Sequence, residues 1–188
     1  MCRASNAILE KRMKTLGAIL LLLVVLVAQG DDGWTTVNEG FSMSVPKNWK
    51  RQKVQPIDSN CGTYRANTAD LEFDEVYGLG YTKEKSQSAI EKLKQKEADP
   101  KLLKPGEEVW HVDGRIAHFI SEKVDPQQYG KRRFSNVASL HVPYDGQPGY
   151  LEIYIFYKTD KDLPTVRKVL QSVKWKAKTT DRQDKPSK

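Results

Sequence analysis

The feature that most constrains the fold is a pair of strand–turn–strand segments in the second half of the chain. Two extended runs, Glu107–Val112 and Arg115–Lys123, are separated only by Asp113-Gly114. An Asp-Gly dipeptide between two extended runs is among the strongest sequence signals for a β-hairpin. The runs Phe134–Pro143 and Tyr150–Tyr157 flank a second glycine-containing turn in the same way. The sequence therefore predicts antiparallel strand pairs.

Shorter runs on either side of these hairpins extend the pattern. In Phe41–Val45 apolar and polar side chains alternate with a period of two, which is typical of a half-buried strand. We expect this strand to pair with Trp34–Val37. Gly62–Ala66 and Leu71–Tyr77 are the next two predicted strands, joined by a polar turn. Val173–Trp175 is expected to close the domain.

Two helices are predicted between the strands. The first ends before Pro100, with Ser86 or Ser88 as its N-cap. The second starts at Asp160. Its side chains spaced for packing on a sheet are Leu163, Val166, Val169 and Leu170. Because the strands come in hairpins and do not alternate with helices, the prediction is an α+β fold, an antiparallel β-sheet with helices packed on it.

Residues 1–30 have the pattern of a secretory signal peptide. Basic side chains precede the apolar run Leu16–Ala28, and Ala28-Gln29-Gly30 places small residues where signal peptidase reads them. The apolar run is shorter than the roughly 20 residues that cross a bilayer, although a single N-terminal anchor is the alternative. Met13 can replace Met1 as the start, because the segment after it is still a complete signal.

Cleavage after Gly30 would release an exported protein, secreted or periplasmic. We expect one domain over residues 31–176 and a disordered polar tail over 177–188. The formal net charge of +7 includes +3 from the first 30 residues and +3 from the residues after Trp175. The folded part is therefore near neutral, and no nucleic-acid partner is expected, since such a partner requires a basic face.

The first part of the chain resembles the PsbP/Mog1-like superfamily in Gly40–Trp49, which reads GFSMSVPKNW. The C-terminal strand Tyr150–Tyr157, the helix from Asp160 and Gln171–Trp175, which reads QSVKW, are similar as well. The resemblance covers Trp34–Lys176 and includes exported bacterial members of unknown function. It implies an α/β/α sandwich used mainly to dock onto other proteins, as on photosystem II in plants or a Ran-type GTPase in yeast. Some bacterial relatives are lipoproteins, but this chain lacks the cysteine that follows their signal segment.

Catalytic and metal signatures are absent from the sequence. His111, His118 and His141 have no paired-ligand spacing and are expected on different strands, so no zinc site is predicted. Cys61 is the only cysteine after residue 30, which excludes an internal disulfide. It is expected to be a partly buried apolar residue, and nothing in the sequence brings it to a histidine as a thiol dyad. We predict no enzyme activity and no cofactor.

Three carboxylates alternate along one predicted strand. Asp70, Glu72 and Asp74 would share one strand face. A row of this kind can hold a calcium ion. An exposed sheet edge would produce the same row, and without a calcium-loop motif the edge is the favoured interpretation.

The loop Gln127–Phe134 combines a basic triplet with aromatic residues, the types that anchor interfaces. It can be an interaction patch, or a solvated loop with its aromatic side chains in the core; both alternatives stay open. The candidate interaction residues are Trp49, Tyr129, Lys131, Arg132, Arg133 and Phe134.

The expected function is that of an exported, non-enzymatic module that docks on an unidentified envelope or extracellular protein. The alternatives are an exported small-ligand or metal-binding protein and, last, a hydrolase. Replacing Lys131–Arg133 with serine is expected to weaken partner capture without lowering thermal stability.

Overall fold

The computed structural model describes residues 33–38, 40–53, 60–76 and 80–175. The chain divides into two compact units, Met1–Trp34 and Thr35–Lys188. The first unit, which contains the predicted signal peptide, lies outside the described residues except for Gly33 and Trp34. The predicted tail 177–188 also lies outside them. The fold below is that of the second unit.

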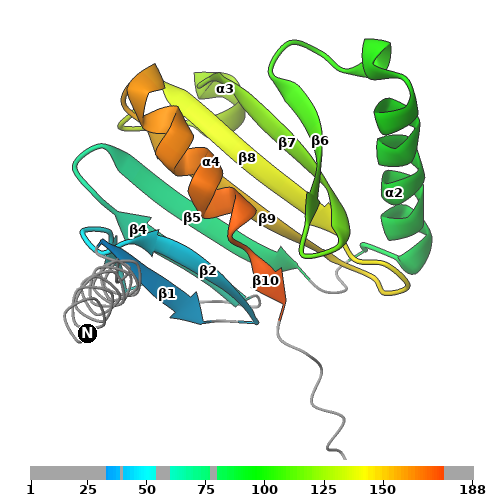
Figure 1. The fold of residues 1–188 in the computed structure, drawn as a ribbon, viewed down its shortest axis with the longest axis horizontal. Coiled ribbons are helices and arrows are strands. Elements are labelled where there is room, and N and C mark those ends of the chain that lie inside the picture. Colours follow the sequence, from blue (N-terminus) through cyan, green and yellow to red (C-terminus); the bar gives the residue numbers. More distant parts are fainter. Residues whose placement is uncertain (1–32, 39, 54–59, 77–79, 176–188) are drawn as a thin grey trace, which may run out of the picture. The chain divides into compact units, whose positions relative to one another are not determined.

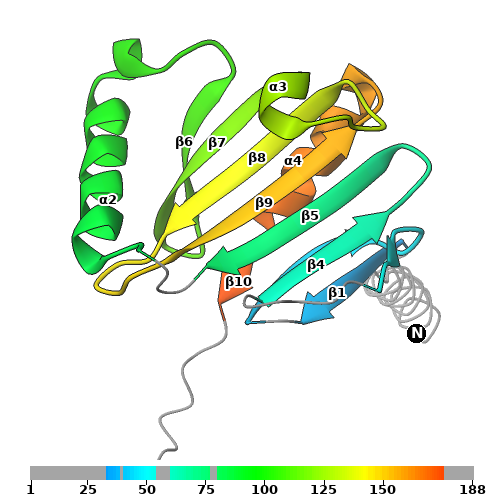
Figure 2. The ribbon, with the colours of Figure 1, turned by 180° about the vertical axis from the view of Figure 1, so that it is seen from behind.

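An antiparallel sheet of seven strands, counted within the described residues, forms the centre of this unit (Figures 1 and 2). Its strands are β3 (Lys50–Arg51), β4 (Asn60–Arg65), β5 (Ala69–Val76), β6 (Glu107–Val112), β7 (Arg115–Lys123), β8 (Asn136–Pro143) and β9 (Tyr150–Tyr157). Their order across the sheet is β3-β4-β5-β9-β8-β7-β6. Every neighbouring pair is antiparallel, which confirms the hairpin prediction.

A smaller sheet joins the two ends of the described chain. It contains β1 (Trp34–Asn38), β2 (Phe41–Pro46) and β10 (Lys174–Trp175), in the order β1-β2-β10. β10 runs antiparallel to β2, with Trp175 opposite Phe41. The predicted alternation along β2 is confirmed, because its side chains are buried and half-buried in turn.

Three α-helices occur in the described chain, α2 (Lys83–Ala98), α3 (Pro126–Tyr129) and α4 (Leu163–Gln171), with 3-10 turns at Pro100–Leu102 and Asp160–Asp162. The N-cap of α2 is Thr82, whose side chain accepts a hydrogen bond from the Lys85 N–H. The prediction of Ser86 or Ser88 as the cap is therefore wrong; Ser86 is buried and bonds with Gly149. α3 lies in the segment that the sequence predicts to be a polar loop.

Helices α4 and α2 lie on opposite faces of the large sheet. The Arg167 guanidinium of α4 contacts the rings of Trp110 and Phe119. From α2, Lys96 instead contacts Glu107, which points to the other side of the sheet because side chains alternate along a strand. We call these two sides the α4 face and the α2 face. This arrangement confirms an α+β fold with helices packed on an antiparallel sheet.

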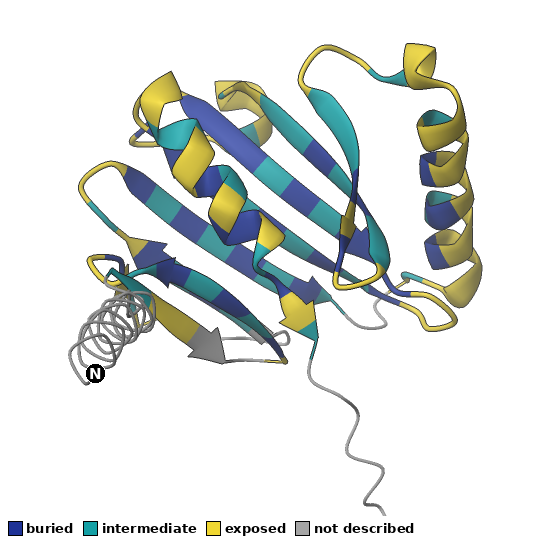
Figure 3. Ribbon diagram, viewed as in Figure 1, coloured by how far each residue is buried: buried dark blue, intermediate teal, exposed yellow. Residues whose placement is uncertain are grey.

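The main core lies on the α4 face, which α4 and β2 cover (Figure 1). Figure 3 shows buried positions alternating with half-buried ones along β5 and the strands beside it. The rings of Phe41 and Phe73 meet edge to face at 5.2 Å. One charged side chain, Glu75, is buried in this core and accepts a 2.6 Å hydrogen bond from the Tyr144 hydroxyl.

Candidate functional site

The loop that carries the predicted interaction residues folds over the α2 face, at the end where β4 turns into β5. Asp125 caps α3 through a 2.8 Å hydrogen bond from the Gln127 N–H. The Phe134 ring, only 9% exposed, forms a small buried cluster with Val137 and Phe156. The aromatic residue at the end of the loop therefore belongs to the core.

Tyr129 and Trp49 also support the fold. Tyr129 packs against the same buried cluster, and its hydroxyl donates a 2.7 Å hydrogen bond to Glu122. Burial and this hydrogen bond raise the pKa of Tyr129, so its hydroxyl keeps its proton. Trp49 is 6% exposed, and its backbone N–H donates a hydrogen bond to the Pro46 carbonyl. Trp49 and Phe134 are both buried, so these two candidate interaction residues pack in the core and do not present their rings at the surface.

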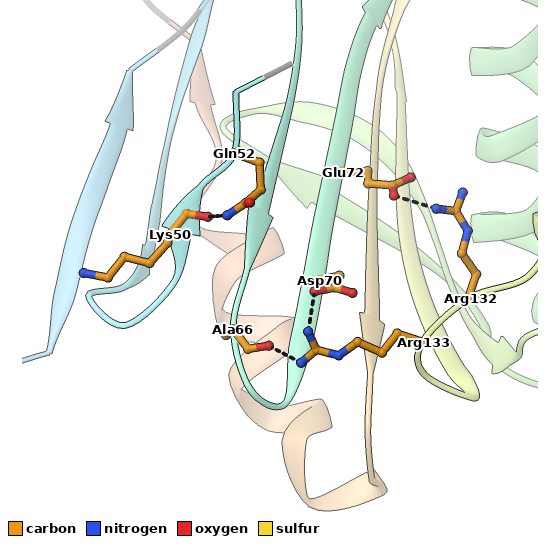
Figure 4. Close-up of polar contacts among 7 residues, drawn as sticks. All are labelled: Lys50, Gln52, Ala66, Asp70, Glu72, Arg132 and Arg133. Atoms are coloured by element: carbon orange, nitrogen blue, oxygen red, sulfur yellow. Dashed lines mark hydrogen bonds and ion pairs between the residues drawn. The ribbon is translucent and has the colours of Figure 1, made fainter.

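Arg132 fastens the loop to β5. Its guanidinium donates a 2.5 Å hydrogen bond to Glu72 and lies 4.4 Å from the centre of the Phe156 ring. Its Nε atom also donates to the Tyr129 carbonyl at 2.8 Å. These contacts fix the direction in which the side chain points (Figure 4).

Arg133 reaches the turn between β4 and β5. It donates a 2.5 Å hydrogen bond to the Ala66 carbonyl, and a second guanidinium nitrogen lies 3.7 Å from Asp70 (Figure 4). The guanidinium is also 4.4 Å from the centre of the Phe134 ring. Two of the three predicted basic residues therefore hold the loop in place.

The acidic row on β5 has a different setting from the one predicted. Asp70, Glu72 and Asp74 are half-buried and share one face, as expected. β5 lies between β4 and β9, however, so the interpretation of an exposed sheet edge is wrong. Arg133 and Arg132 lie against the first two carboxylates. Within the described part of the chain, no group of three or more His, Cys, Asp or Glu residues is placed to hold a metal ion.

Two further cations at this end of the sheet, Arg65 and Lys131, have no partner among the described residues. Lys131 and Arg65 are exposed, and neither makes an ion pair or a side-chain hydrogen bond with any part of the described chain. Lys50 lies opposite Arg65 in the β3–β4 register.

Arg65 and Lys131 border a depression of about 250 Å³. It is lined by Arg65, Asp70, Glu72, Lys131, Arg132, Arg133 and Phe156. Four cations and two carboxylates surround it, which makes it electropositive. We call Arg65, Lys131, Arg132 and Arg133 the basic rim.

The strand register also aligns a row of titratable residues that sequence reasoning missed. Cys61, Asp74, Glu152, His141 and His118 are successive cross-strand neighbours on β4, β5, β9, β8 and β7. The three histidines are on different strands, as predicted, but two of them are adjacent. Cys61 is three strands from His141, roughly 14 Å at the usual strand spacing. The register therefore excludes a thiol dyad between these two residues.

Glu152 is the carboxylate at the centre of this row. It lies 3.1 Å from Nδ1 of His141. Burial, followed by the negative charge of Glu152, raises the pKa of Tyr154 to about 12. Tyr154 is therefore a neutral side chain at ordinary pH.

No family model matches the chain, and no curated protein matches it. Among solved structures, a protein from Bacteroides thetaiotaomicron VPI-5482, crystallised at 1.50 Å resolution, is similar with a TM-score of 0.46 and 10% sequence identity. The similarity covers 74% of this chain and 46% of that chain, so the present chain spans less than half of the length of its structural neighbour. In the described residues, no helix has the length and apolar character needed to span a membrane.

The different roles of neighbouring basic residues can be measured. Arg132→Ala removes an ion pair and a contact with the Phe156 ring. We expect the free energy of unfolding to fall by about 1–2 kcal/mol. Lys131→Ala should stay within about 0.5 kcal/mol of the wild type, because nothing in the described structure contacts its ammonium group. Urea denaturation of both variants checks this. Equal stability of the two would show that Arg132 does not hold the loop.

From the sequence, replacing Lys131, Arg132 and Arg133 with serine is expected to leave thermal stability unchanged. The contacts of Arg132 and Arg133 correct this expectation, because replacing these two residues removes interactions that hold the loop in place.

Proposed function

We propose that this chain is an exported, non-enzymatic docking module that binds an acidic protein partner through the basic rim. The observation that carries the proposal is that Arg65 and Lys131, which have no ion-pair partner in the described part of the chain, lie beside an electropositive depression. Complementary charge across an interface accelerates encounter and selects the partner. An acidic surface would supply Arg65 and Lys131 with the counter-charges that the described residues do not.

The rim is also held in shape before any partner arrives. Arg132 and Arg133 anchor the loop through carboxylates, carbonyls and rings. Lys131, which comes between α3 and these two arginines in the sequence, is exposed. A rigid loop loses little conformational entropy on binding, so more of the contact energy appears as affinity. This division between anchoring arginines and free cations supports recognition as the role of the surface.

Capture from the host tests the proposal. The full chain with a C-terminal tag would be crosslinked in its host and its partners identified by mass spectrometry. We expect one stoichiometric acidic partner, and at least about tenfold weaker capture by the double variant Arg65→Glu/Lys131→Glu. The matched control is Lys92→Glu/Lys101→Glu, which makes the same change in net charge at exposed positions away from the rim.

The control variant should capture the partner as the wild type does, and added salt should weaken capture by the wild type because it screens exposed charges. Undiminished capture by the Arg65→Glu/Lys131→Glu variant would refute the role of the rim. N-terminal sequencing of the captured protein tests export in the same sample. A mature chain that starts at Asp31 is expected, and a start at Met1 or Met13 would refute signal cleavage.

A further inference from the structure

Helix α2 is attached to the sheet differently at its two ends. In its first turn, the Ser86 hydroxyl donates a 3.2 Å hydrogen bond to the Gly149 carbonyl and accepts a 3.3 Å hydrogen bond from the Gly149 N–H. Neither bond involves a charged group. Ile90 and Leu93, each 5% exposed, pack in the middle of the helix. The last turns are held by charged groups instead, because Nζ of Lys96 lies 2.6 Å from Glu107 on β6.

His118 lies next to this ion pair. Its Nε2 atom is 3.4 Å from the Glu107 carboxylate. The atom is buried, and the contact does not have the geometry of a hydrogen bond. The side chains of His118 and Glu107 are 19% and 10% exposed, so water screens this group poorly. A charge added to the imidazole here would act strongly on its neighbours.

The groups that face His118 include basic side chains and carboxylates, and they come from four elements. Lys96 lies on α2, Glu107 on β6, and His141 on β8, with Glu152 of β9 bound to His141. Glu107 is already shared, because it accepts hydrogen bonds from Lys96 and from the Lys104 N–H. Protonation of His118 would therefore add a positive charge beside Glu107, a carboxylate that already accepts hydrogen bonds from two other donors.

We propose that α2 is a pH-sensitive clamp whose last two turns come loose from the sheet when His118 is protonated. Opening would start at the C-terminal half of the helix, since the Ser86 contact at the other end does not titrate. It would also widen the cleft of about 460 Å³ that α2 forms with the β6–β7 hairpin, where Ile90 lies across from Ile116 and Pro143. The clamp lies at a different part of the domain from the basic rim and does not depend on the proposed docking function.

The direction of the pH effect follows from the environment of the imidazole. Burial, and next the charge of Lys96, lower the pKa of His118, while Glu107 opposes them. The open form therefore takes up a proton more readily than the closed form. The closed state keeps its full stability above about pH 6.5, the ordinary value for histidine, and loses stability as the pH falls below it.

Hydrogen exchange of the full chain tests the clamp. Opening constants for the amides of residues 90–98 would be measured between pH 7.5 and 5 and corrected for intrinsic exchange. We expect them to rise by up to about tenfold per pH unit, the limit for one proton, while the amides of β9 change less. His118→Gln should abolish the rise. His111→Gln is the matched control and should keep it, because His111 contacts the same helix through Glu97 from an exposed position.

The proposal would be overturned if the opening constants of residues 90–98 did not change with pH in the wild type, or if they rose in His118→Gln as they do in the wild type. If His118→Gln does not fold, the imidazole of the wild type can be titrated by NMR. A midpoint below about 6.5, shared by the amide shifts of α2, is expected. A midpoint at or above that value would overturn the proposal without any variant.

Discussion

Phe119→Ala should lower the free energy of unfolding by about 3–5 kcal/mol, the usual cost of removing a buried aromatic side chain. Phe119 is fully buried on β7 and stacks on Trp110, with ring centres 4.1 Å apart and planes at 6°. The Arg167 guanidinium lies within 5 Å of the centres of both rings. It also makes two 2.7 Å hydrogen bonds to Glu108. The substitution would therefore leave a cavity at the place where α4 is attached to the sheet.

Urea denaturation monitored by circular dichroism measures this effect. The midpoint should fall while the slope against urea stays constant, which identifies a change in stability with no change in the surface exposed on unfolding. Phe119→Leu is the control, since it retains much of the apolar volume and should cost roughly 1–2 kcal/mol. A loss below about 1 kcal/mol for Phe119→Ala would mean that the stack is not part of the cooperative core.

Gly40→Ala should cost about 2–4 kcal/mol, from overpacking and from the displacement of a hydrogen-bonded buried carboxylate. A Cβ atom at position 40 would overlap the Glu75 carboxylate. That carboxylate is 2% exposed and accepts a hydrogen bond from Tyr144, so it cannot move aside without losing a partner. The requirement for glycine at this position comes from space, because the Glu75 carboxylate occupies the place of a Cβ atom.

A double-mutant cycle tests whether the overlap with the Glu75 carboxylate causes this loss of stability. Glu75→Ala will itself destabilise the protein, but it removes the atoms that a Cβ at position 40 would meet. Gly40→Ala should then cost close to nothing in the Glu75→Ala background. If the two substitutions add their effects, they do not share the contact, and the explanation by overlap is incorrect.

The sequence predicted local elements well because their signals are local. Asp113-Gly114 set the ends of β6 and β7 to the residue, and alternation located β2. The first helix was also found, but its cap was misplaced. Thr82 and Ser86 are both suitable caps in sequence, and only the packing of Ser86 against Gly149 in a distant turn decides between them.

The candidate site was harder to predict because it depends on register. Glu72 and Arg132 are 60 residues apart, and nothing in either segment indicates that they meet. The same is true of His118 and His141, which face each other across a strand pair whose connection is not a tight turn. The basic triplet was visible in the sequence, but the separation of one free lysine from two anchoring arginines required the positions of their carboxylate and carbonyl partners.

The pairing of β10 with β2 has a consequence for how the protein is made. Ser42 lies opposite Lys174, so the smaller sheet cannot be completed until the end of the domain has been synthesised. Contacts that close such long loops form late and slow folding. A chain that is still emerging from the ribosome would carry β2 before its partner strand β10 has been made. A premature stop before Lys174 should therefore yield a product that cannot complete the smaller sheet and exposes the β2 edge to proteases and chaperones.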